Sequence, residues 1–123
     1  MPVQLVSDVV LAIPAGATTT QTSPDFNNSQ ARGLSVTLDM TAVGTGSVTL
    51  TIQGKDRASG KYYTLLAGAA VVTNVTNRYV IYPAYPVVAN VSANEVLPAI
   101  WRIVCTANNA NPATYSVGAT MLV

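Results

Sequence analysis

The side chains that could do chemistry in this chain gather in one short segment, "IQGKDRASGKYY", which spans residues 52–63. The sequence of 123 residues contains only six Lys or Arg and five Asp or Glu residues. Four of these charged residues lie within seven consecutive positions of the segment, at Lys55, Asp56, Arg57 and Lys61. Such a cluster could hold a phosphate group, contact nucleic acid, carry out acid–base catalysis, or form the solvated end of a β-hairpin.

The details of the segment argue against phosphate binding and catalysis. A phosphate-binding loop needs two glycines at a fixed spacing, then Lys and Ser or Thr, and then a helix. Gly54 and Gly60 are one residue too far apart, Tyr62 replaces the hydroxyl residue, and a strand pattern follows. Asp56 has a cation on each side, which would keep it ionised and inert as a base.

The alternative is a hairpin tip. Ser59 and Gly60 supply turn chemistry, and the charged side chains then lie in water at the end of two strands. We therefore predict a solvated tip at residues 55–61. Lys55, Arg57 and Lys61 remain candidate contacts to an acidic surface on a partner.

Charge and residue content exclude several classes of function. The net charge is +1, which gives no long-range field to attract nucleic acid or an anionic membrane. Histidine is absent, Cys105 is the only cysteine, and the five carboxylates are scattered along the chain. No apolar run approaches the roughly 20 residues that span a bilayer. We predict a non-enzymatic protein with no metal or cofactor and with neither nucleic acid nor membrane as a partner.

The composition bears on the kind of surface that the protein presents. Half of the residues are apolar, but only 9% are charged, against about 25% in a typical domain. The surface must therefore be formed largely by Thr, Ser, Asn and Ala, which cost less to desolvate than Lys or Glu. Such a surface suits a protein that packs against many neighbours. The alternative is an ordinary β-domain with a neutral surface.

Hydrophobic residues alternate with polar ones along several segments, as in half-buried β-strands. The pattern predicts an antiparallel β-sandwich of seven or eight strands over residues 31–123, with jelly-roll or Ig-like Greek-key topology. We expect a hairpin connection at 42–47, a strand within 69–75, and one helical turn begun by Ser92 and Glu95. The residues predicted to be buried are Leu34, Val36, Leu38, Val48, Leu50, Ile52, Trp101, Ile103, Tyr115 and Val117.

Residues 1–30 differ from the rest, because a long connection rich in Thr, Ser, Asn and Pro follows a short apolar run. Loops this long are uncommon inside a compact domain. We predict an N-terminal arm and linker that pack on a neighbouring chain, with Val3, Leu5 and Val6 as candidate contacts. The alternative is an edge strand of the same sandwich followed by a surface loop.

The aromatic residues offer a different hypothesis, that of a carbohydrate-binding module. Tyr62, Tyr82 and Tyr85 could stack sugars if they formed an exposed row. Packing in the core or at an interface is the favoured interpretation, because prolines surround Tyr82 and Tyr85 and Tyr63 directly follows Tyr62.

Several short motifs, in order, resemble a family of small virion proteins encoded by tailed bacteriophages. The similarity covers residues 34–123. The matching segments are 39–42 ("DMTA"), 52–56 ("IQGKD"), 59–61 ("SGK"), 62–63 ("YY"), 97–98 ("LP"), 101–103 ("WRI") and 115–119 ("YSVGA").

The resemblance implies a structural protein without catalytic residues, on the outer surface of a phage head. Its expected role is a capsid decoration, or cement, protein that binds the major capsid protein and stabilises the capsid through subunit contacts. A homo-oligomer such as a trimer is expected. The alternative is a tail- or head-associated adhesion or carbohydrate-binding module.

Overall fold

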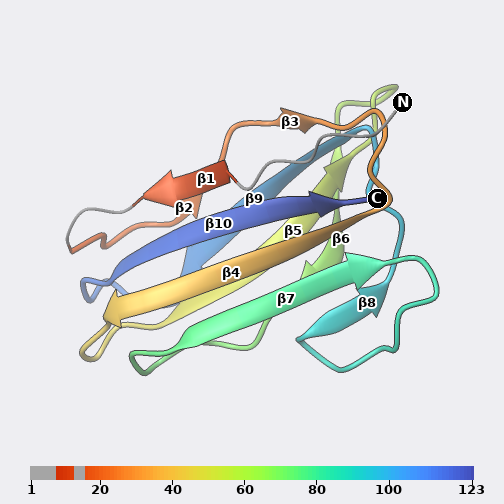
Figure 1. Cartoon of the computed structure of the whole chain (residues 1–123). Helices are drawn as coiled ribbons and strands as arrows, with labels where there is room; N and C mark the ends of the chain where they lie inside the picture. Colours follow the sequence, from red (N-terminus) through yellow and green to blue (C-terminus); the bar gives the residue numbers. More distant parts are fainter. Residues whose placement is uncertain (1–7, 13–15) are drawn as a thin grey trace.

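The computed structural model describes residues 8–12 and 16–123, and it shows a sandwich of two β-sheets (Figure 1). Within these residues there is no helix, and hence none that could cross a membrane. The predicted all-β sandwich is confirmed. The strands are β1 (Asp8–Ala12), β2 (Gln21–Thr22), β3 (Phe26–Asn27), β4 (Gly33–Ala42), β5 (Val48–Lys55), β6 (Tyr62–Ala67), β7 (Thr76–Tyr82), β8 (Ser92–Asn94), β9 (Ile100–Ala107) and β10 (Thr114–Leu122).

The order of the strands is that of a jelly roll. The first sheet runs β1-β10-β4-β7-β8, and the second runs β2-β9-β5-β6, with β3 also paired to β9. All the paired strands are antiparallel except β7 and β8. If β2 and β3 count as one interrupted strand and the short β8 is left out, eight strands remain, as a jelly roll requires.

The described part of residues 1–30 contributes to both sheets. β1 pairs with β10 at the edge of the first sheet, and Leu11 packs against the core. In the second sheet Ser23 bridges the gap between β2 and β3: its backbone N–H donates to Ile103 O, and its hydroxyl accepts from Ile103 N–H, both at 2.9 Å. The edge strand of the alternative is therefore present, but the segment that follows it pairs with β9 through β2 and β3 instead of forming only a surface loop. Val3, Leu5 and Val6 lie outside the described residues, and their contact with another chain stays a prediction.

The hydrophobic core lies between the sheets, and the alternating pattern located it correctly. Side chains at every second position of β4, β5, β9 and β10 point inward and exclude water from the interior. All ten predicted core residues are buried: Leu34, Val36, Leu38, Val48, Leu50, Ile52, Trp101, Ile103, Tyr115 and Val117.

The expected hairpin at residues 42–47 is wrong, because β4 and β5 lie in different sheets. The connection is a tight turn that crosses the sandwich, with Gly46 N–H donating to Val43 O at 2.7 Å. The alternation of apolar and polar residues could not predict this, because a strand with one buried face has the same pattern in either sheet. Between consecutive strands of the described chain, the only antiparallel hairpin joins β5 and β6.

Two further local predictions are also wrong. Residues 69–75 form a connection from the second sheet to the first, and only Val71 makes a bridge, to Val48. Ser92 begins the short strand β8 rather than a helical turn. Its hydroxyl donates to Pro86 O at 2.7 Å and accepts from Val88 N–H at 3.0 Å, so it braces the β7–β8 loop instead of capping a helix.

Candidate functional site

The charged segment that stood out in the sequence forms the tip of the β5–β6 hairpin, as predicted. Asp56 N–H donates to Lys61 O at 2.8 Å, and Gly60 N–H donates to Asp56 O at 2.7 Å. Gly60 has a φ of +76°, a left-handed conformation that glycine adopts without steric cost. The turn therefore closes on its own backbone, and no helix follows that could complete a phosphate site.

Asp56 organises this turn rather than acting as a base. One carboxylate oxygen accepts from Ala58 N–H at 3.1 Å, and the other accepts from the Ser59 hydroxyl at 2.7 Å. These two bonds, with that from Ser59 the larger effect, lower the pKa of Asp56. A carboxylate held ionised in this way is a poor proton acceptor at neutral pH.

A second carboxylate, Asp25, lies beside the hairpin and was not identified from the sequence. The Tyr62 hydroxyl donates to its two oxygens at 2.7 and 2.9 Å, and Lys55 Nζ lies 3.1 Å from Oδ2. The bond from Tyr62, followed by that from Lys55, lowers the pKa of Asp25. The same contact with Asp25 raises the pKa of Lys55. Lys55 is thus held against the sheet, unlike a freely moving surface lysine.

Arg102 completes this arrangement on the outer face of the second sheet. Its guanidinium carbon lies 3.4 Å from the centroid of the Tyr62 ring, and its Nε donates to Gln53 Oε1 at 2.8 Å. Strand register explains the meeting: Gln53 is directly opposite Arg102, and Lys55 is directly opposite Tyr62. Side chains from three adjacent strands therefore form one layer over the sheet.

These contacts create a surface that we call the cationic end, defined by Lys55, Arg57, Lys61 and Arg102. It holds four of the six cations of the chain, and the nearby acids Asp25 and Asp56 leave a local charge of 4 − 2 = +2. Neither Arg57 nor Lys61 has a side-chain ion pair within the part of the chain that is described. By contrast, the loops at the other end of the sandwich, residues 43–47, 68–75 and 108–113, contain no charged residue.

The cationic end can attract and orient an acidic surface, because its four cations outnumber the two nearby acids. Both of its carboxylates have lowered pKa values. Cys105 lies apart from this surface in the core, where burial raises the pKa of its thiol to about 12 and disfavours the thiolate. In the described residues no three His, Cys, Asp or Glu side chains come together as a metal site.

The proposed row of sugar-binding tyrosines is not present. Tyr62 belongs to the second sheet and has Arg102 over its ring, whereas Tyr82 belongs to the first sheet and donates to Val123 O at 2.7 Å. Tyr85 lies in the β7–β8 loop. Tyr63 packs over Gly54, where an added Cβ would lie only 2.6 Å from the ring.

No protein-family model matches the chain, and no curated protein matches it significantly.

Proposed function

We propose that this protein is a structural component of a tailed-phage particle, binding the outer capsid surface as a decoration protein. Its partners are then the major capsid protein and further copies of itself, with a trimer as the expected stoichiometry. It works through surface contacts and not through catalysis. The support comes from the resemblance of residues 34–123 to small virion proteins, together with the surface described next.

The observation that carries the proposal is an exposed apolar loop between β7 and β8, residues 83–91. Val87 is 69% exposed, Val88 52% and Val91 45%, and Tyr85 is also exposed. No charged residue occurs between Arg78 and Glu95. Exposed apolar side chains grouped without charges are typical of the centre of a protein–protein interface, where charged residues are depleted.

Two features of the sandwich fit the same role. The strand β6 is an edge of the second sheet, and an edge strand can pair with another chain. The cationic end belongs to the second sheet and the loop follows a strand of the first, and in this proposal the cations lie at the rim of the contact. Rim charges mainly set the rate and register of association, whereas apolar contacts supply affinity.

The proposal is tested by adding the purified chain to phage capsids that lack it and measuring co-sedimentation. Val87→Ser should weaken capsid binding about tenfold if this side chain is buried in the contact. Val123→Ser is the matched control, because Val123 is similarly exposed but lies at the chain end outside the loop. Equal binding by both variants and the unmodified chain would contradict a role for the loop, and no binding by any of them would contradict the proposal itself.

A further inference from the structure

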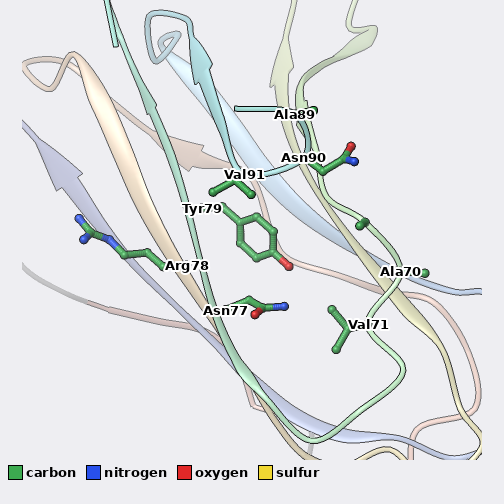
Figure 2. Close-up of a pocket in the computed structure, with 9 residues that line it drawn as sticks. Ala70, Val71, Asn77, Arg78, Tyr79, Ala89, Asn90 and Val91 are labelled. Carbon is green, nitrogen blue, oxygen red and sulfur yellow. The ribbon is translucent and has the colours of Figure 1, made fainter. Parts of the chain in front are cut away.

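A pocket of about 340 Å³ opens at the flank of the sandwich, apart from the cationic end, and two residues of the hydrophobic core, Val71 and Tyr79, contribute to its lining (Figure 2). Three chain segments form it: the β6–β7 connection, strand β7, and the β7–β8 loop. Its volume falls at the small end of the range of about 300–1,000 Å³ that is usual for ligand sites. The lining residues are Ala69, Ala70, Val71, Asn77, Arg78, Tyr79, Ala89, Asn90 and Val91.

The hydroxyl of Tyr79 is the unusual group in this pocket. Tyr79 is only 3% exposed, and its hydroxyl has no hydrogen-bond partner among the described residues. Figure 2 shows the ring with its oxygen directed toward the space between Asn77, Asn90 and Val71. Burial raises the pKa of Tyr79, and the nearby Asn77 side chain opposes this shift by less, but the two side chains do not meet in the geometry of a hydrogen bond.

A buried hydroxyl without a partner is costly, so a group that completes its hydrogen bonds would bind favourably. The pocket offers such a group further polar contacts through the side-chain amides of Asn77 and Asn90. Amides and a phenol both donate and accept hydrogen bonds. A ligand hydroxyl, which also donates and accepts, is complementary to all three.

The remaining surface of the pocket is uncharged. Arg78 contributes to the lining, but its Nε donates to Ser35 at 3.0 Å on the outer face of the first sheet, and its side chain points away from Tyr79 (Figure 2). Alanine and valine side chains form the apolar walls. An ionic ligand would therefore find no counter-charge here, whereas the C–H face of an uncharged ligand would find apolar contacts.

We propose that this pocket binds a neutral saccharide unit, with the Tyr79 hydroxyl and the amides of Asn77 and Asn90 contacting its hydroxyl groups. The ligand class follows from the pocket chemistry: small, uncharged, rich in hydroxyls and partly apolar. The inference concerns a different kind of partner from the capsid and is tested on the isolated protein, although the pocket shares Ala89, Asn90 and Val91 with the loop proposed to contact the capsid.

The test is a titration of the ¹⁵N-labelled protein followed by amide NMR shifts, including the side-chain amides of Asn77 and Asn90. The probes are glucose, galactose, N-acetylglucosamine and rhamnose, each raised to about 50 mM, because a ligand of this size has a Kd on the order of millimolar. Glucuronic acid is the charged analogue of glucose and tests for a preference for uncharged ligands. Cyclohexanol is a largely apolar ring of similar size and tests whether the sugar hydroxyls are needed.

At least one neutral sugar should shift the amides of Ala70, Asn77 and Asn90 in a saturable way, and glucuronic acid should bind at least tenfold more weakly than glucose if glucose binds. Tyr79→Phe should weaken sugar binding about tenfold. Asn90→Gly should also weaken it, and glycine keeps the local backbone, because Asn90 has a φ of +63°. Tyr85→Phe is the control, since Tyr85 does not line the pocket.

Three results would overturn the inference. One is the absence of shifts at these amides with all four neutral sugars. Another is binding of cyclohexanol alone, which would make the pocket an apolar site. The third is a loss of stability in Tyr79→Phe without any change in sugar binding, which would show that the hydroxyl is already satisfied within the protein.

Discussion

The Arg102 guanidinium carbon lies 3.4 Å from the centroid of the Tyr62 ring, so a charged side chain covers an aromatic face on the outside of the second sheet. Tyr62 in turn donates to Asp25, and Arg102 donates to Gln53. Three adjacent strands are thereby connected by side chains where the hairpin leaves the sheet. The cationic end is held rigidly by these contacts, apart from the two cations at its tip.

Replacing Arg102 with Lys should lower the free energy of unfolding by about 1 kcal/mol, because the planar stack on Tyr62 and the bond to Gln53 are lost while the charge is kept. Chemical denaturation measures the change. Arg57→Lys is the matched control at the exposed tip and should have no measurable effect. An Arg102→Lys variant as stable as the unmodified protein would show that the stack contributes nothing.

The free energy of unfolding should decrease in acid, and part of this decrease should come from protonation of Asp25. The folded-state pKa of Asp25 lies below its ordinary value of 3.8, so its ion pair and hydrogen bonds stabilise the fold above that value. The contribution is lost as pH falls through the lower, folded-state pKa. Asp25→Asn should therefore be less stable than the unmodified protein at about pH 6, and the difference should shrink toward about pH 2.

The control for this pH experiment is Glu95→Gln, which removes an exposed carboxylate outside the cluster. The free energy of unfolding of this variant, measured by denaturation, should stay close to that of the unmodified protein between about pH 6 and about pH 2. A stability difference for Asp25→Asn that is independent of pH would contradict the role of the ionised carboxylate.

Replacing Lys55, Arg57 and Lys61 together by Ser should leave the fold intact, because the turn is held by Asp56, Ser59 and its own backbone. Circular dichroism and thermal unfolding check the fold. If the tip docks on an acidic surface, capsid binding of the unmodified chain should weaken with salt, and the variant should lose this dependence. Loss of folding would show that the cations, and not the turn, maintain the hairpin.

Removing the N-terminal segment in two steps should separate assembly from folding. Deletion of residues 1–14 removes β1 and the packing of Leu11, so it should lower the melting temperature. Deletion of residues 1–7 leaves β1 in place and removes Val3, Leu5 and Val6. If these residues contact another chain, the shorter deletion should weaken assembly or capsid binding with little change in melting temperature; the reverse pattern would contradict that contact.

The sequence predicted the buried residues well, because inward-facing positions of a strand carry a local signal with a period of two. Ile52 and Gln53 show this: one is buried and the next lies on the outer face, as the alternation requires. The same signal failed at residues 42–47, since which sheet each strand joins depends on contacts distant in sequence. The strand order of the jelly roll was accordingly left open between two topologies.

The cluster around Asp25 was missed for a related reason. Its partners Lys55 and Tyr62 are 30 and 37 positions away, and Arg102 meets Gln53 only through the register of β5 on β9. A local sequence pattern could identify the charged hairpin, but it could not show that Asp25 lies beside it. The sequence of the β2–β3 segment did not indicate a strand. Pro24 interrupts the segment, and the Ser23 side chain replaces part of the backbone hydrogen bonding.

Cryo-electron microscopy of intact particles of the phage proposed to encode the chain tests the proposed function most directly. The account predicts repeated density for this jelly roll on the outer surface of the head, with the β7–β8 loop facing the capsid and copies of the chain in contact. Density confined to the tail, or particles that lack the protein altogether, would contradict it.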